Sequence, residues 1–115
     1  MCNIEITTYN DCVLASTVGT SWFMEDGVDC LNEELLTLKE ILAKKPKVLI
    51  MDVTSLHILP THMVGLWFSI IKELTGQEFC EMQKKHEGFM VIINEVQLHA
   101  MKADQSADFF VYNVI

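Results

Sequence analysis

The segment covering residues 47–74 constrains the fold more than any other part of this chain. It contains a continuous apolar run at residues 48–51, which ends at Asp52. A short loop follows, and from Thr61 onward apolar residues recur at helical spacing. Continuous apolar runs of this length are typical of central strands covered on both faces. A buried strand followed by a helix indicates an α/β domain with parallel strand pairing.

The rest of the chain shows the same alternation of strand and helix patterns. The first two strand patterns flank a turn signal at Asn10 and Asp11, so they predict an antiparallel hairpin. We predict strands over 3–8, 12–18, 47–53, 89–94 and 109–115, helices over 27–45, 61–74 and 95–102, and a turn over 104–108. The sequence therefore predicts one α/β domain over residues 1–115, with a mixed sheet of four to five strands and about three helices.

The charge of the chain excludes some classes of partner. Acidic residues number 16 against 8 basic ones, and the formal net charge is -8. All the basic residues are Lys. Nucleic-acid binding needs a basic face for the phosphates, so we expect no nucleic-acid partner. The longest apolar run, within residues 63–71, is too short to span a bilayer and contains Ser69, so we expect no membrane partner.

The four cysteines indicate a reduced protein without a metal centre. None forms a CxxC pair, and none is spaced with a histidine as in a zinc site. The N-terminal residues lack the apolar stretch of a signal peptide. We therefore expect a cytoplasmic protein without a cofactor, whose thiols act as small apolar side chains.

Thr61 is the first candidate functional residue, because it places a hydroxyl at the predicted start of a helix. Free backbone N–H groups and the helix dipole favour negative charge at such a position. A phosphorylated Thr61 would carry roughly -1.5 to -2 charges there and would disrupt an acidic or apolar partner docked on it. The simpler interpretation is an N-cap threonine, which stabilises a helix by about 1 kcal/mol.

Two histidines, His57 and His62, bracket the same loop. With Asp52 they could form a small-ligand or metal site, but a metal needs three or four ligands and only Asp11 is a further candidate. The pattern is more typical of two loop histidines. No phosphate-binding glycine loop, GxSxG elbow or HExxH motif occurs, so we predict that the protein is not an enzyme.

The helix pattern after Thr61 has an unusually wide apolar stripe. Its members are Val64, Trp67, Phe68, Ile71 and Leu74. The simplest interpretation is that either Trp67 or Phe68 is buried in the core. A stripe this wide nevertheless predicts that the helix packs on two sides or exposes one side to a partner. An exposed patch containing Met63 and Trp67 would suit protein binding.

The order of elements and the segment 47–74 resemble the STAS domain family of anti-sigma factor antagonists and stressosome scaffold proteins. The family has Asp-Leu-Ser, an apolar pair, and Asp-Ser/Thr-Ser-Gly-Leu-Gly opening a helix. This chain has Asp52-Val53-Thr54, then Ile58-Leu59, then Pro60-Thr61-His62-Met63-Val64-Gly65. Pro60, His62 and Met63 depart from that motif, while Thr61 and Gly65 keep it. The resemblance implies that a partner kinase phosphorylates Thr61 and that the phosphate blocks binding to that partner.

These observations predict a non-enzymatic, STAS-like regulatory module that binds a protein partner. The predicted contact surface is the loop over residues 57–63 and the start of the following helix, with the residues His57, Pro60, Thr61, His62, Met63 and Trp67. The resemblance implies as partner an anti-sigma factor or switch kinase, or other STAS domains, with a homo-oligomer as one form. A ligand-binding or metal-binding domain using the same loop, and an unmodified structural scaffold, remain the alternatives.

Overall fold

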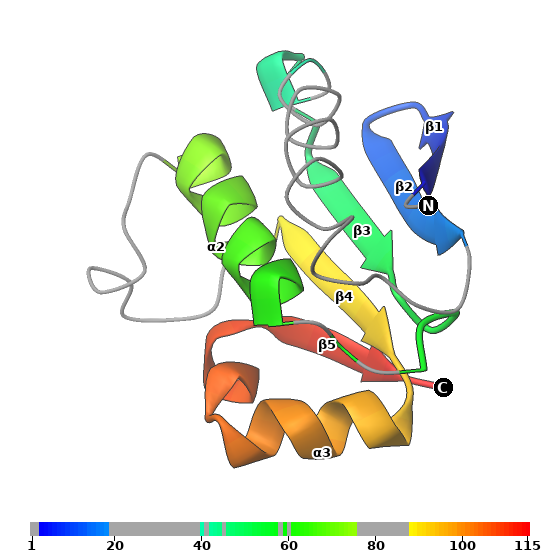
Figure 1. Ribbon diagram of the computed structural model, residues 1–115. Helices are drawn as coiled ribbons and strands as arrows, with labels where there is room; N and C mark the ends of the chain where they lie inside the picture. The colour runs from blue at the N-terminus through cyan, green and yellow to red at the C-terminus, as the bar shows by residue number, and fades with distance from the viewer. Residues whose placement is uncertain are drawn as a thin grey trace.

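A computed structural model describes residues 3–18, 40, 42–44, 46–57, 59, 61–75 and 88–115, with the side chains of residues 3, 61, 62 and 75 excepted. Figure 1 shows the elements in chain order. They are β1 (Asn3–Tyr9), β2 (Cys12–Val18), β3 (Val48–Asp52), α2 (Thr61–Thr75), β4 (Phe89–Ile93), α3 (Glu95–Ala103), the 3-10 helix η2 (Ser106–Phe109) and β5 (Val111–Val114). Most of the helix predicted over 27–45 lies outside the described residues, but Glu40, Leu42 and Ala43 within it are helical.

The strands form one mixed sheet in the order β1-β2-β3-β4-β5. β1 pairs antiparallel with β2, and the later neighbours pair in parallel. The turn between β1 and β2 includes Asn10, whose φ of 48° lies in the left-handed region that asparagine tolerates. The predicted hairpin, the mixed sheet and the α/β class are thus confirmed.

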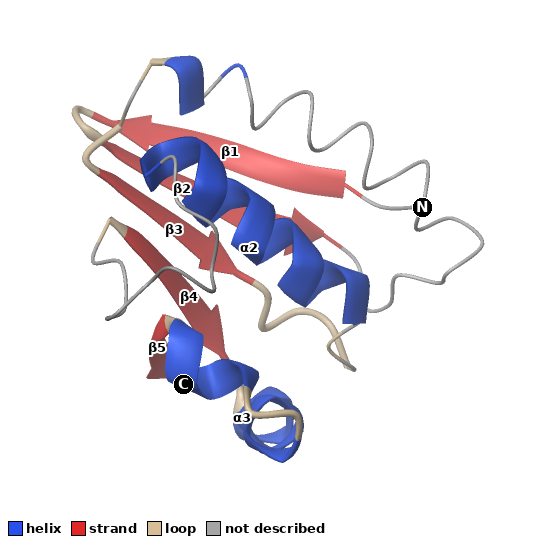
Figure 2. Ribbon diagram, turned by 90° about the vertical axis from the view of Figure 1, so that its left-hand side faces the viewer, coloured by secondary structure: helices blue, strands red, loops and turns tan. Residues whose placement is uncertain are grey.

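Helices α2 and α3 lie on the same face of the sheet: Figure 2 shows α2 in front of the strands, and α3 contributes Met101 to the core cluster that contains the buried residues of α2. The chain passes from β3 to β4 through α2 and from β4 to β5 through α3, so both crossovers move in the same direction across the sheet. Because such crossovers are right-handed, both helices lie on one face. This inner face carries the core. Ala15, Met51 and Val91 are neighbours in register, and each is 0% exposed. The opposite face is called the outer face below.

The last strand is shorter than the pattern predicted. We expected a strand over 109–115, but β5 covers Val111–Val114, and Phe109 ends the 3-10 helix η2. The backbone N–H of Ser106 donates to Asp104 Oδ1 at 2.9 Å, which favours a turn there. The Phe110 ring then packs among other aromatic rings, with a centroid 4.9 Å from that of Phe68. Phe110 itself already has an extended backbone, with φ -124° and ψ 143°, so the difference from the prediction is confined to Phe109 and the end of the strand.

Gly65 provides a stability prediction in α2. It is exposed, and a methyl group on its Cα would meet no other atom within 4 Å. A glycine inside a helix costs roughly 0.5–1 kcal/mol relative to alanine. We expect Gly65→Ala to raise the free energy of unfolding by about that amount, measured by urea denaturation. The reverse change at an exposed site of α3, Ala100→Gly, should lower it similarly; a destabilised Gly65→Ala variant would contradict the open space around Gly65.

Candidate partner-binding site

The candidate site lies where β3 ends and α2 begins. Parallel strands end at one edge of the sheet, and α/β domains commonly place their functional residues at this carboxyl edge. β3 ends at Asp52, one residue before the predicted end, and α2 begins at Thr61, as predicted. Between them the structure describes residues 53–57 and Leu59. Leu59 is partly buried and packs against the core.

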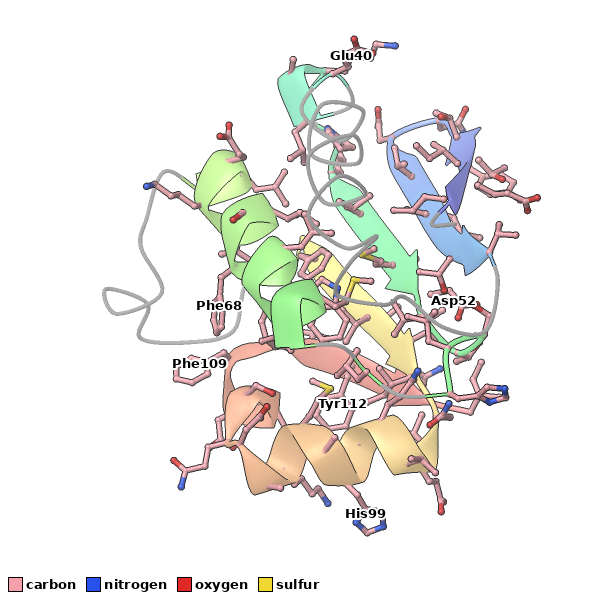
Figure 3. All side chains as sticks on the ribbon, in the orientation of Figure 1. Glu40, Asp52, Phe68, His99, Phe109 and Tyr112 are labelled. Carbon is pink, nitrogen blue, oxygen red and sulfur yellow. The ribbon has the colours of Figure 1, made fainter. Side chains whose placement is uncertain are left out.

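Asp52 folds the start of this loop. Its Oδ1 accepts hydrogen bonds from the Thr54 backbone N–H at 2.9 Å and from the Thr54 hydroxyl at 2.6 Å. A carboxylate bonded to the backbone two residues later is an Asx turn, which stops the strand and turns the chain. Figure 3 shows Asp52 at the end of β3, on the edge where the loop starts. The Asp-x-Thr sequence therefore has a structural role at the entry of the loop.

Two hydroxyl groups fasten the loop to β2. The Ser55 hydroxyl donates to the Thr17 carbonyl oxygen at 3.0 Å, and the two side-chain oxygens lie 2.7 Å apart. Thr17 is 6% exposed and also donates to the Asp52 carbonyl oxygen at 3.4 Å. Because the partners come from β2 and from the loop, these bonds hold the loop against the neighbouring strand.

Gln97 anchors the loop from the other side. Its side chain is 0% exposed, and its Nε2 donates to the carbonyl oxygens of Val53 at 2.7 Å and Leu56 at 3.0 Å. Its Oε1 accepts from the Asn94 backbone N–H at 2.9 Å, which completes a capping box at the start of α3. Every hydrogen-bonding group of the side chain is thus used. One buried amide ties the first turn of α3 to the loop.

The sequence analysis did not identify Gln97 as a functional residue. Its only signal was the Asn94-x-x-Gln97 spacing, which predicts a capping box. That spacing says nothing of the two carbonyl groups on the loop, which are 44 and 41 residues away along the chain. Only the folded sheet brings Gln97 next to the carbonyl groups of Val53 and Leu56.

The structure separates the predicted contact residues into two groups. His57 is exposed on the loop, and Thr61 is the first residue of α2. Pro60 and the side chain of His62 lie outside the described residues. Met63 and Trp67, however, are each 0% exposed. The prediction that these two contact a partner is therefore wrong for the folded domain.

Trp67 is buried because α2 packs against two parts of the core. Its indole Nε1 donates to Met51 Sδ at 3.2 Å, on the inner face of the sheet. Its ring meets Phe110 edge-on, with centroids 5.3 Å apart. The wide apolar stripe thus packs on two sides, which is one of the two arrangements the sequence allowed. Figure 3 shows Phe68, the partly buried neighbour, beside Phe109.

The described residues offer little support for a metal site at this loop. Within the described ranges, no three His, Cys, Asp or Glu side chains are grouped so that they could hold a metal ion. Asp52 is already engaged with Thr54. Across the same ranges, no helix is both long and apolar enough to span a bilayer.

Comparisons with known proteins identify the fold. No protein-family model and no curated protein matches the sequence. Among solved structures, the chain is similar to the crystal structure of an anti-sigma factor antagonist from Mycobacterium paratuberculosis. The TM-score is 0.71 at 12% identity, over 97% of this chain and 85% of that one. The likeness shows that this chain has the STAS-like α/β fold that its sequence predicted.

Proposed function

We propose that this STAS-like domain is a non-enzymatic regulatory module that binds a protein partner through residues 57–63. Phosphorylation of Thr61 would release that partner. The similar solved structure is an anti-sigma factor antagonist, so the proposed partner is an anti-sigma factor or switch kinase, or another STAS domain. Since Met63 and Trp67 are buried, the proposed contact surface is reduced to His57, Pro60, Thr61 and His62.

The anchoring of the loop is the observation that carries this proposal. Residues 53–56 are held by hydrogen bonds to Asp52 in β3, Thr17 in β2 and Gln97 in α3. These bonds hold the chain up to Leu56, the residue before His57. A preformed surface binds a partner with less loss of conformational entropy than a mobile loop does. One buried amide and one pair of hydroxyl groups hold residues 53–56, and a loop fixed in this way supports a binding role for the residues that follow it.

The first turn of α2 suits a phosphate on Thr61. It contains no acidic residue, whereas the first turn of α3 contains Glu95. A phosphate there would meet the positive end of the helix dipole without a nearby carboxylate on that turn. The same phosphate would oppose an acidic or apolar partner surface through its charge and its hydration. These features support Thr61 as the proposed switch residue.

Substitutions at Thr61 test this proposal. We expect Thr61→Ala to keep the partner during affinity purification from the natural host, and Thr61→Asp to lose it by roughly tenfold or more. Mass spectrometry of the wild-type protein should locate phosphate on Thr61. Thr8→Asp is the matched control, because Thr8 is exposed on β1 at the opposite end of the sheet. If Thr61→Asp and Thr61→Ala retain the partner equally, the switch is refuted.

A further inference from the structure

The edge of the sheet at β1 is a long strand with a neighbour on one side. In the part of the chain that the structure describes, β1 pairs with β2 and with no other strand, and Figure 1 shows it at one side of the sheet. Its register over Asn3–Tyr9 has no bulge, and it contains neither Lys nor Pro. Proteins commonly protect an edge strand by such residues, by a bulge or by keeping it short. β5, at the other edge, has four residues, so of the two described edges β1 is the one without such protection.

The hydrogen bonds of β3 show which backbone groups of β1 point to this edge. The Leu49 N–H donates to the Gly88 carbonyl oxygen at 2.8 Å, toward β4, so its neighbour Val48 bonds toward β2. The Val48 N–H lies 3.4 Å from the Asp11 carbonyl oxygen, and the next residue, Cys12, therefore bonds toward β1. The same alternation continues along both strands of the hairpin. The backbone groups of β1 that bond to β2 are thus those of the residues opposite Cys12, Leu14 and Ser16, which are Tyr9, Thr7 and Glu5.

The remaining residues, Ile4, Ile6 and Thr8, direct their backbone N–H and C=O groups toward the edge of the sheet. Ile4 and Ile6 are on the inner face, since their neighbours in register, Thr17 and Ala15, are 6% and 0% exposed. Both isoleucines pack against the core, yet both remain partly exposed. A further strand bonded to this edge would therefore satisfy the backbone groups and cover apolar side chains at the same time.

We propose that a second copy of this chain pairs with β1 along this edge, antiparallel and about a two-fold axis at Ile6, so that the two sheets become one. Ile6 then exchanges both backbone hydrogen bonds with Ile6 of the second copy, and Ile4 does the same with Thr8 of the second copy. The two Ile6 side chains face each other on the inner face, where a pair of β-branched residues is favourable. A two-fold interface uses the same surface on both subunits, as this pairing does.

The sequence of β1 is the reason for choosing a second copy as the occupant. With the axis at Ile6, the acidic side chain of Glu5 lies opposite Thr7 of the second copy, and both residues are exposed. An axis at Glu5 would place two carboxylates directly opposite each other, which is unfavourable. An axis at Thr7 would place Ile4 opposite Asn10, which is in the turn and not in the strand. β1 therefore fits its own copy in one register, with every backbone group at the edge paired.

The size of the pairing sets the strength of the dimer. A strand of seven residues provides less area than the roughly 800 Å² per partner of a standard interface. Two chains that each carry a net charge of -8 also repel each other. We therefore expect a weak dimer, with a dissociation constant of about 10–300 µM. The loop over 57–63 takes no part in it, so a failure of the dimer leaves the proposed function untouched.

Sedimentation velocity between about 1 and 1000 µM, at a salt concentration of about 0.15 M, tests the proposal. The wild-type chain should shift from monomer to dimer across this range. Thr8→Pro removes an N–H that bonds to the second copy and none that bonds to β2, so it should weaken dimerisation about tenfold or more. Thr8→Val keeps the N–H and should leave the dissociation constant within about threefold. Circular dichroism melting checks that each variant is folded.

Charges placed at Thr7 test the register. Thr7→Lys sets an ammonium group opposite Glu5 of the second copy and should strengthen the dimer about threefold to tenfold. Thr7→Glu sets a carboxylate there and should weaken it by a similar factor. Ala100→Lys makes the same change of net charge at an exposed position of α3 and should change the dissociation constant by less than about twofold. If Thr8→Pro does not fold, the variants at Thr7, whose side chain is exposed, decide the question.

Hydrogen exchange resolved by residue locates the interface. As the concentration of the wild-type chain rises, the N–H groups of Ile6 and Thr8 should exchange about threefold more slowly or less, while that of Thr7 stays as protected as in the monomer. A wild-type chain that is monomeric at every concentration overturns the proposal. So does a dimer whose dissociation constant is unchanged by Thr7→Glu and Thr7→Lys, or one that leaves the exchange of Ile6 and Thr8 unchanged.

Discussion

Replacing Gln97 by Met is expected to lower the free energy of unfolding by about 3 kcal/mol. The substitution keeps the length of the side chain and removes its amide. The carbonyl oxygens of Val53 and Leu56 then lose their bonds to Nε2, at residues that are 0% and 1% exposed. Each buried polar group left unpaired costs about 1–3 kcal/mol. The Asn94 backbone N–H also loses its acceptor, which removes half of the capping box.

The neighbouring residue provides a matched control for Gln97→Met. Val96 is 66% exposed in the same turn of α3, so Val96→Met should change the stability by less than about 0.5 kcal/mol. Urea denaturation measures both variants. Hydrogen exchange should also show faster exchange at residues 53–57 than in β4 for Gln97→Met. A loss below about 1 kcal/mol would mean that Gln97 does not anchor the loop.

Replacing Trp67 by Ala is expected to lower the free energy of unfolding by about 4 kcal/mol. The side chain is 0% exposed and packs edge-on against Phe110, with ring centroids 5.3 Å apart. The substitution opens a large cavity between α2 and the sheet, and it removes the hydrogen bond to Met51 Sδ. Domains of this size are stable by about 5–15 kcal/mol, so the variant loses a large share of its stability and should melt at a clearly lower temperature.

An exposed position in the same helix controls for the effect of Trp67→Ala. Glu73 is exposed, and Glu73→Ala should change the stability by less than about 0.5 kcal/mol. Both variants are measured by thermal and urea denaturation. If Trp67→Ala costs less than about 1 kcal/mol, then Trp67 is not in the core, and a contact between Trp67 and a partner becomes tenable again.

Local patterns were enough to predict most of the fold. The hairpin, the strand ending at Asp52 and the helix beginning at Thr61 each follow from apolar periodicity and turn residues within a few positions. The STAS-like topology then follows from the order of these elements. The 3-10 helix at Ser106–Phe109 lies partly in the predicted turn over 104–108, and Phe109 was assigned to the strand because it opens an apolar run. The ring contacts of Phe110 with Trp67 and Phe89 are not contained in the local sequence.

The candidate site was predicted less completely, because its parts meet only in three dimensions. The apolar stripe gave the position of Trp67 on the helix but not the two surfaces that bury it. The Asn94-x-x-Gln97 spacing is typical of a capping box, but nothing in the local sequence indicates the bonds from Gln97 to the loop. The position of Thr61 at a helix start needed only local signals, and the structure confirms it.

The central claim is tested most directly by comparing how the partner binds to the phosphorylated and to the unphosphorylated form of this protein. For this test, a kinase from the host is used to place phosphate on Thr61 of the purified wild-type chain, and half of the sample is then treated with a phosphatase. Calorimetric titration with the partner recovered from the host compares the two forms. We predict that the phosphate on Thr61 weakens binding by roughly tenfold or more and that the phosphatase restores it. Equal affinities of the two forms would contradict the account of Thr61 as the switch of this surface.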